Sequence, residues 1–83
     1  MSLNIPKGAV YAEFTGAAKK GKSFTHNLKY LDASERTVGM QDDEVVSASS
    51  YAEWSRQVDA IIEELQQADP PVHTQRPTAP NFP

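Results

Sequence analysis

The sequence predicts a small α+β domain: a β-hairpin or three-stranded antiparallel meander packed against one long C-terminal amphipathic helix, with an extended Pro-rich tail. Three observations carry this prediction. Apolar and polar residues alternate in the first half of the chain, a helix-capping signature opens a helical pattern at Ser50, and residues 70–83 contain five prolines. We therefore expect an N-terminal arm over residues 1–8, a single domain over 9–69 and a tail over 70–83 that stays outside the core.

Two segments carry the period-two pattern of half-buried strands. The first is residues 9–15, where one face is formed by Val10, Ala12 and Phe14. The second is residues 23–31, where one face is formed by Phe24, His26, Leu28 and Tyr30. Residues 23–31 also contain apolar residues at helical spacing, so the pattern predicts a strand there and leaves a helix open.

Residues 36–41 form the third predicted strand, with Val38 and Met40 facing the core. Gly39 between them indicates a bulge or a close approach of another segment. Three adjacent acids at residues 42–44 are typical of a solvated loop. Val45 and Val46, after this loop, are a candidate for a short edge segment before the helix.

The helix is predicted to begin at Ser50, because Ser50 and Glu53 have the spacing of a capping box, in which the side chains bond to free backbone N–H groups. A single apolar stripe at 3-4 spacing follows, formed by Tyr51, Trp54, Val58, Ile61 and Leu65. Core packing explains such a stripe better than a coiled-coil seam, which needs more heptads. The prolines at 70 and 71 end the helix.

Residues 16–23 match the phosphate-binding pattern G-x-x-x-x-G-K-[ST]. A working phosphate loop is followed at once by a helix on a parallel sheet, and it needs an aspartate for magnesium. Residues 24–27 favour a strand instead. Each βαβ unit takes about 30 residues and a doubly wound sheet with crossover helices needs well over about 100, more than this chain of 83 residues has. We interpret residues 16–23 as a lysine-rich hairpin connection, and we expect no enzyme activity.

Composition excludes several other classes of site. The chain has no cysteine, and its two histidines are 47 positions apart, so neither a metal site nor a cofactor is expected. No apolar run approaches the length of a membrane span, and the N-terminus has no export signal. We expect a soluble protein, cytoplasmic or virion-associated, that does not bind membranes.

The tail is predicted to be extended, because its prolines fix the backbone dihedral φ and its apolar residues have no period. Residues 77–80, Pro-Thr-Ala-Pro, resemble the late-budding motif of some enveloped-virus proteins. That resemblance implies recruitment of the host endosomal sorting machinery through a groove that binds extended peptides. The favoured interpretation is a tail that wraps a neighbouring molecule or stays disordered.

These features predict a non-enzymatic protein-interaction or assembly protein, a small accessory protein of the phage or virion type, that docks on a larger protein or on copies of itself. The phage comparison is an analogy at the level of fold. The candidate partner-binding residues are Lys19, Lys20, Lys22, Arg76, Pro77, Pro80 and Phe82. The alternative is a nucleic-acid or phosphate binder that uses loop 16–23, with an aromatic residue for stacking. The acidic isoelectric point, near 5.2, speaks against this alternative.

Overall fold

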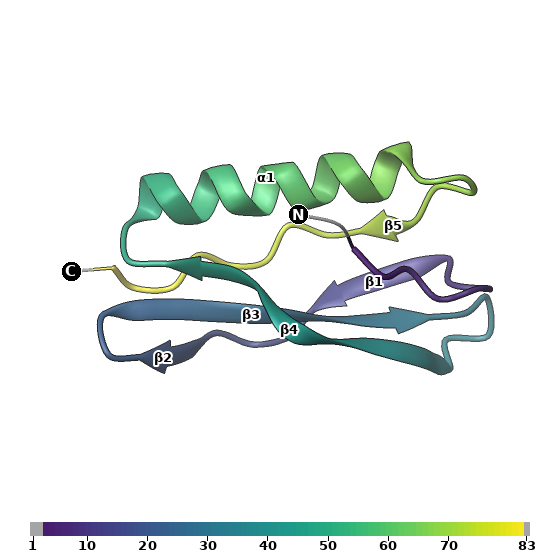
Figure 1. The fold of residues 1–83 in the computed structure, drawn as a ribbon, viewed down its shortest axis with the longest axis horizontal. Helices are drawn as coiled ribbons and strands as arrows, with labels where there is room; N and C mark the ends of the chain where they lie inside the picture. The colour runs from purple at the N-terminus through teal and green to yellow at the C-terminus, as the bar shows by residue number, and fades with distance from the viewer. Residues whose placement is uncertain (1–2, 83) are drawn as a thin grey trace.

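Five strands and one helix form the structure, a computed structural model that describes residues 3–82. The helix lies across one face of the sheet (Figure 1), and the predicted α+β class is confirmed. The elements in chain order are β1 (Tyr11–Phe14), β2 (Ala18–Lys20), β3 (Ser23–Leu31), β4 (Thr37–Ala48), α1 (Tyr51–Gln67) and β5 (His73–Thr74).

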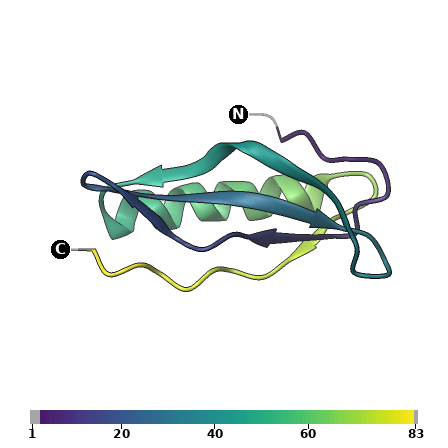
Figure 2. The same cartoon turned by 90° about the horizontal axis from the view of Figure 1, so that it is seen from below.

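Strand β3 is the centre of the sheet. It pairs antiparallel with β4 along one side, and with β1 and β2 in turn along the other. Strand β5 adds to the outer side of β1 in parallel. The sheet is therefore mixed and five-stranded, larger than the predicted antiparallel meander, because two short strands join it. Figure 2 shows the N-terminal arm on the β4 side and the C-terminal residues along the β1 and β2 side.

The core lies between α1 and the sheet. The alternation of β3 turns His26, Leu28 and Tyr30 toward the helix, and all three side chains are buried. The stripe of α1 meets them with Trp54, Val58, Ile61 and Leu65, which are also buried. Burying an aliphatic or aromatic side chain of this size contributes about 1.5–3 kcal/mol, so this face of α1 holds the helix on the sheet. The prediction was wrong for Tyr51, which is 56% exposed at the first turn.

The lysine-rich segment forms a tight hairpin, not a phosphate loop. Strands β2 and β3 are joined by Gly21 and Lys22, and Gly21 has a φ of 61°. A glycine with positive φ at the first central position is typical of a type II′ turn, whose twist suits antiparallel strands. Because β3 follows where a phosphate loop requires a helix, residues 23–31 are a strand and the helical alternative is wrong.

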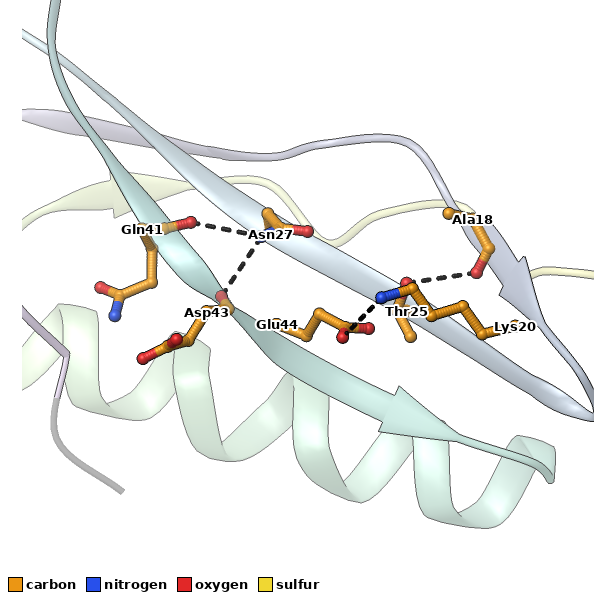
Figure 3. Close-up of polar contacts among 7 residues, drawn as sticks. All are labelled: Ala18, Lys20, Thr25, Asn27, Gln41, Asp43 and Glu44. Atoms are coloured by element: carbon orange, nitrogen blue, oxygen red, sulfur yellow. Dashed lines mark hydrogen bonds and ion pairs between the residues drawn. The ribbon is translucent and has the colours of Figure 1, made fainter.

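The acidic segment is part of β4, so the prediction of a loop at residues 42–44 was wrong. The pairing passes from His26↔Val46 to Leu28↔Gln41, which leaves the residues between them on β4 opposite Asn27 alone. The Asn27 side-chain amide donates to the carbonyl oxygens of Gln41 and Asp43, at 3.3 Å each (Figure 3). One side chain thus holds a bulge that would otherwise interrupt the strand.

The start of β4 pairs with β3 in a register that turns Met40 outward, and a second register shift follows between Tyr30 and Leu31. Val38 is 37% exposed and Met40 is 57% exposed, so the prediction that they face the core was wrong. Met40 pairs with Lys29, which belongs to the sheet face turned away from α1. The close approach predicted at Gly39 is present: a Cβ there would lie 3.1 Å from the Pro6 side chain.

The helix begins at the predicted cap. The Ser50 hydroxyl accepts a hydrogen bond from the Glu53 backbone N–H at 3.2 Å. The Glu53 carboxylate bonds to the N–H and hydroxyl of Ser49, one residue before the position that a capping box uses. Further along α1, the Gln57 amide donates to the Ser47 carbonyl and accepts from its N–H, both at 2.9 Å.

The chain after α1 returns to the sheet. Val72 is 1% exposed and belongs to the core, so the expectation that residues 70–83 stay outside it was wrong. The Val72 N–H bonds to the Leu65 carbonyl, and the His73 N–H bonds to the Val10 carbonyl. Residues 75–82 continue without helix or strand. At the other end, the N–H of Leu3 donates to the Glu64 carboxylate and that of Asn4 donates to the Gln41 side chain.

A candidate interaction groove beside strand β1

A groove of about 830 Å³ opens between β1 and the chain that follows β5. Its walls come from opposite ends of the sequence and include Tyr11, Glu13, Phe14, His73, Arg76 and Pro77. This volume lies within the range of about 300–1,000 Å³ that ligand sites occupy.

Strand β1 forms the first wall. Its alternation buries Ala12 toward α1 and leaves Tyr11 and Glu13 on the opposite face, where Tyr11 is 44% exposed. The Tyr11 ring lies 6.0 Å from the His73 ring, centroid to centroid. The Glu13 carboxylate lies 3.4 Å from the Lys29 ammonium on the neighbouring strand. An aromatic ring and a carboxylate therefore stand side by side on this wall.

Glu35 adds a second carboxylate from the turn between β3 and β4. Its φ is 62°, a conformation that is uncommon for residues other than glycine. The turn is held by Asp32, whose carboxylate accepts from the N–H groups of Ser34 and Arg36 at 2.9 Å, and whose carbonyl accepts from the Glu35 N–H. Glu35 itself is exposed at the rim of the groove.

Arg76 fastens the second wall to the helix. Its guanidinium bonds to the Asp59 carboxylate and the Ser55 hydroxyl, and it lies 5.4 Å from the centre of the Trp54 ring. The hydrogen bond with Asp59 is the main cause that raises the pKa of Arg76 above its ordinary value. The positive charge of this wall is therefore engaged with α1.

The edge of β1 stays open next to this wall. The Thr15 N–H donates to the Asn27 carbonyl, so the backbone groups of Thr15 point toward β3. Successive residues of a strand direct their N–H and C=O groups to opposite sides, so those of Phe14 point away from β3. Continuing β5 in its register would require an N–H at Pro77 to reach the Phe14 carbonyl, and proline has none. The ladder ends at Thr74, whose hydroxyl donates to the Ala12 carbonyl at 2.7 Å.

The predicted lysines lie at the far end of the hairpin, away from the groove-lining residues. Lys20 forms a 2.9 Å ion pair with Glu44 (Figure 3), and this hydrogen bond is the main cause that lowers the pKa of Glu44. Lys19 lies over the Phe24 ring, 5.8 Å from its centre. Lys22 is exposed in the turn. The local positive charge is thus partly balanced by the acidic bulge of β4.

The end of the tail reaches the same hairpin. The Phe82 ring packs edge-on against the Phe24 ring, with 5.0 Å between centroids. Pro80 is half-buried. The predicted residues therefore lie in two places. Arg76 and Pro77 line the groove. The three lysines lie at the hairpin, and Phe82 reaches the hairpin by its contact with Phe24.

Sequence reasoning missed the wall formed by β1. The outward positions of Tyr11 and Glu13 were visible in the alternation of residues 9–15, but only the return of the tail turns that face into a groove. It also missed the buried pair of His26 and Trp54, in which the indole N–H donates to His26 Nε2 at 3.0 Å. Both residues were visible on the inward faces of their elements, but no sequence signal paired them.

Among the side chains that the structure describes, those of residues 3–41 and 43–82, no group of three or more histidines, aspartates or glutamates is arranged to hold a metal ion. None of the described helices is long and apolar enough to cross a membrane. Comparison with protein-family models, curated protein sequences and solved structures found no match.

Proposed function

We propose that this chain is a non-enzymatic interaction or assembly protein that docks on a larger protein partner through the groove beside β1. The observation that supports the proposal is the groove itself, which the α+β body and the Pro-rich tail build together. Exposed large side chains lie on the sheet face turned away from α1, with Tyr11 44% and Met40 57% exposed. Surfaces of this kind are common at protein–protein contacts. A cytoplasmic or virion-associated accessory role goes with this proposal.

The Pro-rich tail has a defined part in it. Residues 75–78 form one wall, so a partner in the groove would touch both the body and the tail. Because Arg76 is fastened to α1, the wall is in place before any partner arrives. A preformed wall lowers the ordering cost of binding.

The test is affinity capture from the native source with quantitative mass spectrometry. The full chain is compared with two variants that alter one wall each: Tyr11→Ser on β1, and a chain that ends at Gln75. Gln66→Ala, on an exposed position of α1, is the matched control. All four proteins are first checked for native circular dichroism.

We expect the same captured protein to be lost with both wall variants and kept with the control. Capture that is unchanged with both wall variants would contradict a docking site in the groove.

A further inference from the structure

The charges around the groove are unbalanced. Two carboxylates, those of Glu13 and Glu35, line it, whereas the one guanidinium in its lining, that of Arg76, is bonded to α1. Lys29 lies 3.4 Å from Glu13 and offsets part of that charge, although the Lys29 side chain is itself 37% exposed and able to turn into solvent. The groove therefore favours a cationic occupant.

Tyr11 lines the groove together with both carboxylates. Glu13 follows it on the same face of β1, and Glu35 lies in the turn that follows Leu31, the cross-strand neighbour of Tyr11. The face of an aromatic ring attracts ammonium and guanidinium groups, and carboxylates nearby add to that attraction. A Lys or Arg side chain lying over Tyr11 would meet a ring and two carboxylates at once.

The backbone beside the ring is suited to an extended peptide. The N–H and C=O of Phe14 point toward the groove, and β5 ends before it reaches them. An extended segment that bonds to such an open edge gains main-chain hydrogen bonds, and its alternate side chains face the same wall.

We propose that the groove binds an extended, Lys- or Arg-bearing segment of the partner protein, which pairs with β1 at Phe14 and lays a cationic side chain over Tyr11 between Glu13 and Glu35. This inference rests on the proposed function and names the chemistry of the partner. The groove volume of about 830 Å³ lies within the range of about 300–1,000 Å³ for ligand sites, which has room for side chains of a short segment.

The test uses the full chain and two synthetic seven-residue peptides that alternate valine with a charged residue. One peptide carries lysines, and the other carries glutamates at the same positions. Binding is followed by backbone amide chemical shifts in ¹H–¹⁵N spectra at low salt. We expect the lysine peptide to bind, with shifts at residues 11–14 and 73–78, and the glutamate peptide to leave these residues unmoved.

Variants test each charge. The double variant Glu13→Gln with Glu35→Gln should weaken binding of the lysine peptide about fivefold, because each partly exposed charge contact contributes modestly. Lys29→Met should strengthen binding of the lysine peptide about twofold, because Lys29 no longer competes with the peptide for the Glu13 carboxylate. Glu63→Gln, a helix position at which the carboxylate bonds to Gln67, is the control and should leave the affinity unchanged.

Three results would overturn the inference: equal binding of both peptides, shifts confined to the hairpin at residues 19–24, or an affinity that survives the double variant. A groove that is filled by a second copy of the chain would overturn it too, and would appear as slower tumbling at higher concentration. These outcomes are separate from a failure of the proposed function, which the capture experiment reports through the loss or retention of a native partner.

Discussion

At the scale of single residues, His26 organises the polar part of the core. It is 2% exposed, its Nδ1 lies 2.8 Å from the Thr15 carbonyl, and its Nε2 accepts from the Trp54 indole. A carbonyl only accepts, so Nδ1 carries the proton and Nε2 has the free lone pair. Each of the three groups therefore has a hydrogen-bond partner: Nδ1 bonds to the backbone of Thr15, and Nε2 and the indole N–H bond to each other.

Replacing His26 by leucine should therefore be costly. The variant leaves the Trp54 N–H and the Thr15 carbonyl without their partner in a buried site, and we expect the free energy of unfolding to fall by about 2–4 kcal/mol. Urea denaturation followed by Trp54 fluorescence measures the loss. His73→Leu, at an exposed histidine, is the control and should change stability by less than about 0.5 kcal/mol. Equal effects of the two variants would show that the buried hydrogen bonds do not matter.

Tyr30 makes stability sensitive to alkali. Burial, and to a lesser degree the nearby Glu64 carboxylate, raise the pKa of its phenol above the ordinary 10.0. Because the folded pKa is the higher one, this contribution to stability is fully present below about pH 10 and is lost as the pH rises through the folded pKa. Denaturation at pH 8 to 12 should show a steeper alkaline loss for the natural chain than for Tyr30→Phe. Parallel curves would be evidence against a raised pKa.

At the scale of elements, α1 protects the free edge of β4. Among the described strands, β4 pairs with β3 alone, and an unpaired edge can template association with another chain. The Gln57 amide occupies the Ser47 N–H and C=O as a neighbouring strand would. Two exposed acids on the same strand, Asp43 and Glu44, add repulsion between edges.

Replacing Gln57 by alanine should uncover this edge. We expect a loss of about 1–2 kcal/mol in unfolding free energy from the two hydrogen bonds, together with concentration-dependent association. Urea denaturation and sedimentation velocity measure the two effects. Gln66→Ala makes the same chemical change at an exposed position of the same helix. If both variants sediment as the natural chain does, the Gln57 hydrogen bonds are not needed to keep the β4 edge from associating.

Local signals predicted the elements well and their assembly less well. The period-two pattern gave β3 its observed bounds, Ser23–Leu31, and the cap at Ser50 gave the start of α1. Local pattern failed where a distant side chain decides the outcome. The three adjacent acids at residues 42–44 predicted a loop, yet hydrogen bonds from the Asn27 side chain of β3 to the backbone of this segment hold it in β4.

The candidate site was predictable only in part, for the same reason. Arg76 and Pro77 were predicted as contact residues from the tail alone, but their location depends on Asp59 and Trp54 in the helix. The groove requires the pairing of β5 with β1, residues about 62 positions apart in the sequence. The residue pattern within β1 or within β5 does not predict that the two strands pair.

At the scale of the whole molecule, the first residues of the tail complete the fold. Val72 fills the core below Leu65, and β5 extends the sheet. The remaining residues run along the β1 and β2 side as far as the hairpin, where Phe82 meets Phe24 (Figure 2). The tail is thus part of the folded domain as far as β5, and residues 75–82 beyond it run along the surface.

Two truncations separate these roles. A chain that ends at Asp69 loses the buried Val72 and should lose at least about 2 kcal/mol of unfolding free energy. A chain that ends at Gln75 keeps Val72 and β5, so it should retain a cooperative urea transition. Trp54 fluorescence reports both. Equal midpoints for the chain ending at Asp69 and the full chain would contradict a structural role for the tail.

Competitive release tests most directly whether a protein partner docks in the groove beside β1 through a cationic extended segment. The native partner is captured on the immobilised full chain, and the lysine and glutamate peptides are then added at equal concentration. We expect the lysine peptide to release the partner and the glutamate peptide to leave it bound. Retention of the partner at lysine-peptide concentrations that saturate the groove would contradict docking of this kind.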